Sequence, residues 1–138
     1  MKAFRGALGT VLAALGVAMP VLADAPLDEP ARRLAAYEAG QEVAAGDPRV
    51  ARFQGQLAQV ARITGEGEDV IAAACVRTAR HVFDVTRSKA TPGELLEALV
   101  RFARPGVPMQ DTLREYVTAR RNAPTRGHAE ALAALGGK

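Results

Sequence analysis

The chain contains very few of the residues that most often carry out chemistry in proteins. Its 138 residues include one cysteine, two histidines, one serine, one asparagine and no tryptophan. A single cysteine excludes an intrachain disulfide framework. Its Cys and His residues are also fewer than the four ligands of a structural zinc site. The sequence therefore predicts neither a metal site nor a disulfide-bonded scaffold.

The chain also lacks the composition of a disordered protein and the patterns of a β protein. Hydrophobic residues make up 49% of it, and the formal net charge is only +3. This balance favours folding over disorder, and the length suits one domain. No run alternates apolar and polar residues as a half-buried strand does. We therefore expect an all-α fold.

The first 23 residues have the pattern of a bacterial secretory signal peptide. Lys2 and Arg5 precede the uncharged run 6–19, and small residues at Ala23 and Ala25 offer cleavage sites. Cleavage after Ala23 is favoured, because a cut after Ala25 would place Pro26 at the scissile bond. The alternative is a membrane anchor, but a spanning helix needs about 20 apolar residues. We expect a signal peptide at 1–23, a flexible lead at 24–29, a single helical domain at 30–138, and no stable membrane span after cleavage, in the periplasm or the medium.

Capping signals and apolar periodicity predict a small bundle of five or six helices. Proline at the first helical position and Asp or Thr as N-cap mark the helix starts. The most specific signal is the S/T-x-x-E capping box that begins at Thr91. The expected helices cover about 30–45, 48–64, 68–87, 92–104 and 108–121, followed by a short helix capped by Thr125.

The apolar stripes of these helices predict the core. The helix at 92–104 is apolar over more than half of its circumference, so we expect it to lie at the centre of the bundle. The helix at 68–87 has a stripe with spacings of four and three residues, which we expect to face inward. Its members are Ile71, Cys75, Thr78, Val82 and Val85, widened by Ala74, Ala79 and Phe83.

Cys75 is the only residue to which a redox or nucleophilic role can be assigned, and it needs a nearby base for the latter. His81 lies about 240° around the helix from it, at 100° per residue, so the two side chains point apart. His128 could approach Cys75 only through tertiary folding. We expect a buried core cysteine, and we predict no haem or other cofactor, since no C-x-x-C-H motif is present.

The charge of the chain is unevenly distributed. Without the signal peptide, residues 24–69 carry a net charge of −4 and residues 70–138 a net charge of +5. Arg77, Arg80 and Arg87 fall on one polar face of their helix, together with Asp84. That face is either solvated surface or a docking surface for an acidic protein or an anionic lipid. We expect the remaining basic residues of this half to be exposed as well: Lys89, Arg101, Arg104, Arg114, Arg120, Arg121 and Arg126.

Nucleic-acid binding is not predicted, because no recognition helix and no interleaved aromatics accompany these charges. We expect a non-enzymatic exported protein that binds another protein in an inhibitor, immunity or accessory role. Its layout resembles the small periplasmic immunity proteins that neutralise effectors of type VI secretion, in the signal peptide, the small helical domain and the capped stretch 91–104 with a further helix after it. Many of those domains are disulfide-linked, which one cysteine does not allow. The alternative is a small periplasmic enzyme or redox or cofactor bundle that uses Cys75 with His81 or His128.

Export can be tested directly. Mass spectrometry of the protein recovered from the periplasm or the medium is expected to show a chain that begins at Asp24 or Pro26. Recovery of the full-length chain from the cytosol alone would contradict the predicted signal peptide.

Overall fold

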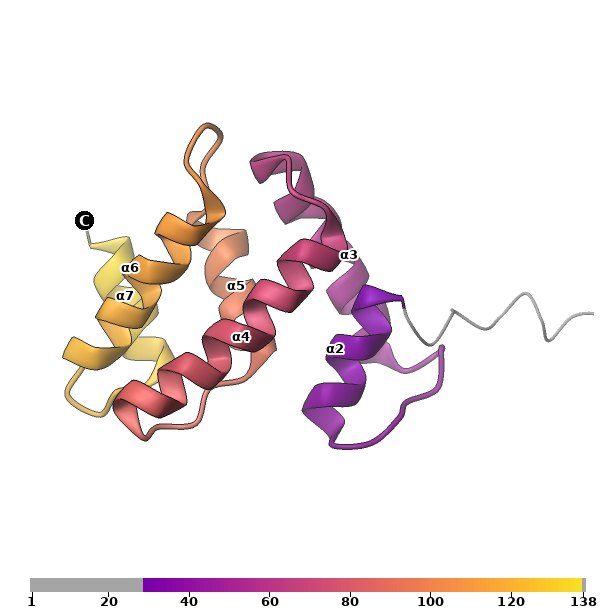
Figure 1. The fold of residues 1–138 in the computed structure, drawn as a ribbon, viewed down its shortest axis with the longest axis horizontal. Helices are drawn as coiled ribbons and strands as arrows, with labels where there is room; N and C mark the ends of the chain where they lie inside the picture. Colours follow the sequence, from indigo (N-terminus) through magenta and orange to yellow (C-terminus); the bar gives the residue numbers. More distant parts are fainter. Residues whose placement is uncertain (1–28, 138) are drawn as a thin grey trace, which may run out of the picture.

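The computed structural model describes residues 29–137, which form six α-helices and no strand (Figure 1). This confirms an all-α fold with the expected number of helices. The predicted signal peptide and all of the predicted lead except Glu29 lie outside the described residues. The helices are α2 (Pro30–Ala39), α3 (Pro48–Thr64), α4 (Glu68–Thr86), α5 (Pro92–Phe102), α6 (Met109–Asn122) and α7 (His128–Gly136).

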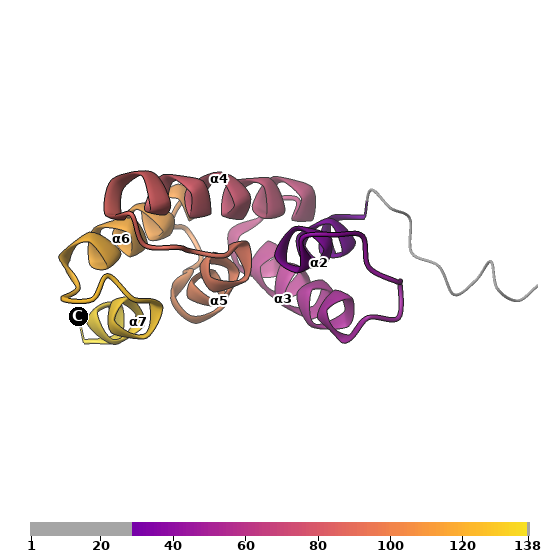
Figure 2. The same ribbon diagram turned by 90° about the horizontal axis from the view of Figure 1, so that it is seen from below.

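Helix α5 lies at the centre of the bundle, as its apolar pattern predicts. It packs against all five of the other helices. The pair α2 and α3 forms one end of the domain, and the pair α6 and α7 forms the other (Figure 1). Helix α4 runs along one side and contacts α2, α3, α5 and α6, so it joins the two ends (Figure 2).

Capping fixes the starts of two central helices. The Thr91 side chain accepts a hydrogen bond from the Glu94 amide at 3.1 Å, and the Glu94 carboxylate accepts one from the Thr91 amide at 2.9 Å. This confirms the predicted capping box of α5. At the start of α3, the Asp47 carboxylate accepts from the Arg49 amide at 2.9 Å, which confirms Asp47 as N-cap.

The first helix was predicted to run to about residue 45, which is wrong. It ends at Ala39, because Gly40 adopts a left-handed conformation with φ of 74° and its amide donates to carbonyls of the last turn. The chain then forms a loop in which Val43 is buried and its carbonyl accepts a hydrogen bond from Arg32 Nε at 3.0 Å. Helix α2 is therefore short, and it leaves part of α4 uncovered.

The predicted cap of the last helix is also wrong. Helix α7 begins at His128 with Gly127 as its N-cap, and the Thr125 amide and hydroxyl instead contact the Glu130 carboxylate. Thr125 lies too early in the chain to cap the first turn, but Glu130 in that turn reaches back to it.

The predicted core stripe of α4 is correct only in part. Ile71, Cys75 and Val82 are buried, but Phe83 and Val85 are 46% and 39% exposed. Phe83 lines a hollow together with Tyr37 and Glu38 from the C-terminal end of α2. Over the described residues, no helix is both long and apolar enough to cross a bilayer.

The central position of α5 leads to a stability prediction. Leu99 is completely buried, so Leu99→Ala is expected to lower the free energy of unfolding by about 2–5 kcal/mol, measured by denaturant titration. Val70 is 44% exposed, so the control Val70→Ala should change it by less than about 0.5 kcal/mol. A cost near zero for Leu99→Ala would mean that the core lies elsewhere.

Candidate binding face on helices α2 and α4

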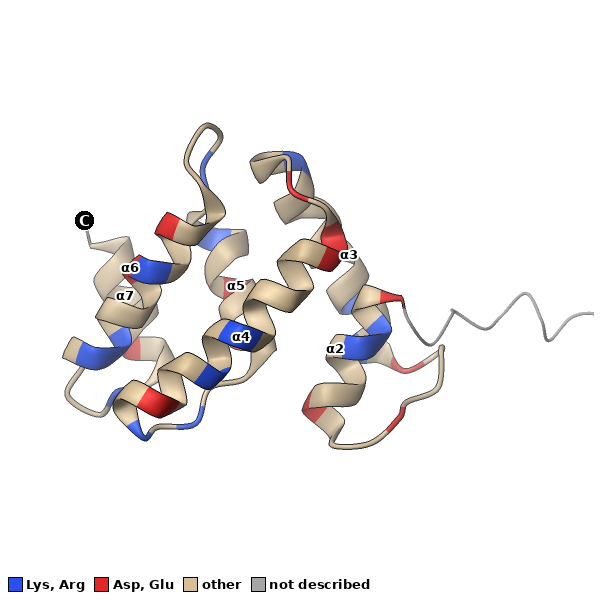
Figure 3. Ribbon diagram, viewed as in Figure 1, with Lys and Arg blue, Asp and Glu red and all other residues tan. Residues whose placement is uncertain are grey.

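The three arginines that the sequence places on one face of α4 are all exposed. Arg77 and Arg80 lie on α4, and Arg87 is its C-cap residue, in a left-handed conformation with φ of 60°. Figure 3 shows basic positions along α4 and on the neighbouring α2. None of the three arginines forms an ion pair with a carboxylate among residues 29–137.

Most arginines elsewhere in the described part of the chain do have an acidic or internal partner. Arg101 pairs with Glu97 at 2.9 Å and Arg114 with Asp111 at 2.9 Å. Arg49, Arg52 and Arg104 also lie within 4 Å of a carboxylate. Seven cations of residues 29–137 have neither a carboxylate nor an internal acceptor as partner, and five of them lie on α2, on α4 or just after α4: Arg33, Arg77, Arg80, Arg87 and Lys89. The other two are Arg62 on α3 and Arg121 on α6.

Two of these seven cations, Arg80 and Lys89, line a hollow of about 410 Å³. It is bounded by the C-terminal end of α2, the second half of α4, and the segment that connects α4 to α5. Tyr37 and Phe83 supply aromatic walls, and Ala79, Ala90 and Pro92 supply small apolar ones.

The two aromatic rings at this hollow are each accompanied by a guanidinium group. The Arg80 guanidinium lies 6.0 Å from the centroid of the Tyr37 ring, and that of Arg87 lies 5.8 Å from the Phe83 ring. Tyr37 is 44% and Phe83 46% exposed. Cation–π contacts at exposed sites are weak, so these groups remain available to a partner.

One wall of the hollow is held by a contact between α2 and α5. The Glu38 carboxylate accepts a hydrogen bond from the Gly93 amide at 2.9 Å, and it lies 3.7 Å from Arg52. A Cβ atom at position 93 would overlap the carboxylate of Glu38. Glycine at this position therefore allows the end of α2 to approach the start of α5.

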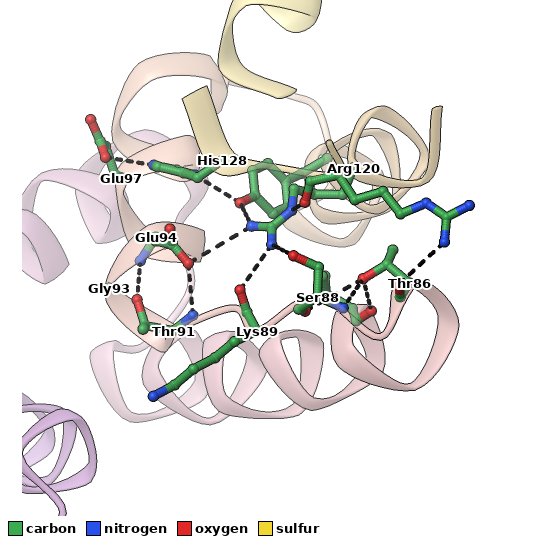
Figure 4. A network of polar contacts seen from close by, with 12 residues as sticks. Thr86, Ser88, Lys89, Thr91, Gly93, Glu94, Glu97, Arg120 and His128 are labelled. Carbon is green, nitrogen blue, oxygen red and sulfur yellow. Dashed lines mark hydrogen bonds and ion pairs between the residues drawn. The ribbon is translucent and has the colours of Figure 1, made fainter. Parts of the chain in front are cut away.

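Arg120, which is 1% exposed, forms hydrogen bonds with the segment that connects α4 to α5 (Figure 4). Its guanidinium donates to the Lys89 carbonyl at 2.9 Å, to the Ser88 hydroxyl at 3.3 Å and to the Arg126 carbonyl at 2.7 Å. It also donates to the Tyr116 hydroxyl at 2.8 Å and lies 3.7 Å from Glu94. Every nitrogen of the guanidinium therefore has an acceptor.

The prediction that Arg120 is a surface residue is wrong. The spacing of α6 contained the signal, because Met109, Leu113 and Tyr116 form an inward stripe that continues at position 120. A charged residue on an apolar stripe indicates a buried hydrogen-bonded group. We expected Arg120 to be exposed because it belongs to a run of basic residues.

His128 extends the same network toward Glu97. Its Nδ1 lies 2.8 Å from the Tyr116 hydroxyl, and its Nε2 lies 2.7 Å from Glu97. Since Tyr116 accepts from Arg120, its own proton can be donated to Nδ1, which leaves the Nε2 proton for Glu97. The hydrogen bond from His128 lowers the pKa of Glu97, and burial raises that of Tyr116 to about 12.

Cys75 is not placed with either histidine. It is completely buried, and burial raises its pKa to about 12, which disfavours the reactive thiolate. His81 is exposed, and both ring nitrogens of His128 contact other side chains. The arrangement gives no support to the enzyme or redox alternative. The described residues also contain no group of three or more His, Cys, Asp and Glu side chains that could hold a metal.

Comparison of the chain with protein-family models, with characterised proteins and with solved structures gave no match. The function therefore has to be argued from the face described above.

The network around Arg120 leads to a prediction for a conservative change. Arg120→Lys places three donors on one nitrogen, which cannot reach the carbonyls of Lys89 and Arg126 together. We expect the free energy of unfolding to fall by about 3 kcal/mol, because buried acceptors lose their partners. The adjacent exposed Arg121 provides the control, and Arg121→Lys should stay within about 0.5 kcal/mol. Equal stabilities of the two variants would contradict the role given to Arg120.

Proposed function

We propose that this is an exported, non-enzymatic protein that acts by binding another protein, in an inhibitor, immunity or accessory role. Export rests on the N-terminal sequence pattern. Binding rests on Arg77, Arg80 and Arg87, which are exposed and have no ion-pair partner among residues 29–137, and on the hollow that Arg80 and Lys89 line.

This face contributes little to the stability of the domain. Even an exposed ion pair is typically worth about 0–1 kcal/mol, and these arginines have no ion-pair partner among residues 29–137. An unpaired row of guanidinium groups instead produces a positive potential that accelerates encounter with an acidic surface. Arginine suits this role because its planar fork can bind a carboxylate through two hydrogen bonds.

Reversal of charge on α4 tests the proposal. The native domain is used to capture its partner from a periplasmic extract, and association with that partner is then measured at low salt. The triple variant Arg77→Glu, Arg80→Glu, Arg87→Glu is expected to associate about tenfold more slowly or worse. Its melting temperature should be almost unchanged.

The control carries the same change in net charge away from this face. Arg62→Glu, Arg104→Glu and Arg114→Glu alter exposed arginines of α3, of the segment after α5, and of α6. This variant should keep most of the native association rate. If the α4 variant captured the partner as fast as the native domain, or if the native domain captured no protein, the proposal would be wrong.

A further inference from the structure

The α2–α4 hollow combines features that point to one kind of ligand. Apolar and polar side chains line it in equal number, and Tyr37 and Phe83 are the aromatic ones beside a volume of about 410 Å³. The chain has only six aromatic residues, and these two are the most exposed of those described, at 44% and 46%. Partly exposed aromatics beside a hollow are typical of the pockets that receive anchor side chains in protein interfaces.

The charges at the rim of the hollow determine which residues can flank the anchor side chain in a bound segment. Arg80 and Lys89 line the hollow and have no carboxylate partner among residues 29–137. Of the two acidic residues that line it, Glu38 is already bound to the Gly93 amide and lies near Arg52. Arg80 and Lys89 therefore outnumber the other acidic residue of the lining, Asp84. The Arg87 guanidinium also lies 5.8 Å from the ring of Phe83.

The hollow is also shaped before a ligand binds. The Lys89 carbonyl accepts a hydrogen bond from Arg120 at 2.9 Å. Two residues further along the lining, the capping box with Glu94 fixes the position of Thr91. Glu38 fixes the end of α2 against Gly93. Preorganisation of this kind reduces the entropy lost on binding.

We infer that the α2–α4 hollow receives an aromatic or large aliphatic side chain from an acidic segment of a partner protein, whose carboxylates pair with Arg80 and Lys89. This inference rests on the proposed function and names the chemistry of the partner. A polyanion such as a nucleic acid fits less well, because the exposed Asp84 carboxylate also lines the hollow and would repel a continuous phosphate backbone. A peptide can place a neutral or basic residue beside Asp84.

Selection from a randomised peptide library displayed on phage provides the probe. Peptides enriched on the native domain are expected to contain one aromatic or large aliphatic residue flanked by Asp or Glu. Synthetic versions of these peptides would then be measured by fluorescence anisotropy, and their affinity should fall as salt is added. Enrichment of basic or uncharged peptides, or no enrichment above an unrelated protein, would overturn the inference.

Variants locate the bound peptide. Phe83→Ala is expected to weaken binding about tenfold or more, and Arg80→Glu with Lys89→Glu should weaken it by a similar factor at low salt. Val70→Ala removes an equally exposed apolar side chain from the other end of α4 and should leave the affinity unchanged. Circular dichroism checks that each variant keeps its helical content. Unchanged affinity for Phe83→Ala would contradict the assignment of the hollow.

The two proposals can fail separately. If Phe83→Ala captures the natural partner normally while the α4 charge variant does not, the partner binds the basic face without an anchor in the hollow. The proposed function would then stand and the inference would be wrong. If single-stranded DNA or RNA competed with the selected peptides at equal phosphate and carboxylate concentrations, the acidic peptide would not be the preferred ligand.

Discussion

The Arg120 guanidinium donates to two backbone carbonyls that belong to different loops. One is Lys89, between α4 and α5, and the other is Arg126, between α6 and α7. A charged group that is 1% exposed is tolerated only when its donors are satisfied, because the desolvation of an unpaired charge costs several kcal/mol. The positions of these loops, and through them the packing of α7 and the start of α5, therefore depend on this one side chain.

This dependence connects the interior of the domain to its surface. The segment that Arg120 holds is also a wall of the α2–α4 hollow. On its other side the hollow is bounded by α2, whose end is fixed by the hydrogen bond between Glu38 and Gly93. Two buried or half-buried polar contacts thus set the distance across the hollow, while the apolar core sets the positions of the helices themselves. A substitution in the network could alter binding without touching the exposed face.

The sequence predicts the helices well because their signals are local. The capping box at Thr91 and the cap at Asp47 depend on residues two or three positions apart, so they can be recognised without tertiary information. The end of α2 also has a local signal, Gly40, which the predicted helix to about residue 45 overlooked. The exposure of Phe83 could not be predicted from local signals. Periodicity shows that a side chain has an apolar neighbourhood on its helix, but it does not show whether another helix covers it. The burial of Arg120 was partly predictable: its position on the apolar stripe of α6 indicates burial, whereas its charge is typical of the surface.

The sequence predicted the candidate site only as a row of arginines. The structure shows the hollow and the residues from other elements that line it. Helix periodicity places Arg77, Arg80 and Arg87 on one side of α4, but only the fold brings Tyr37 from α2 and Lys89 from the next loop to that side. Burial of the Tyr37 and Phe83 rings would be favourable, yet they are 44% and 46% exposed beside Arg80, which has no ion-pair partner among residues 29–137. On the proposed function, a partner protein would provide the apolar and acidic contacts that this surface lacks.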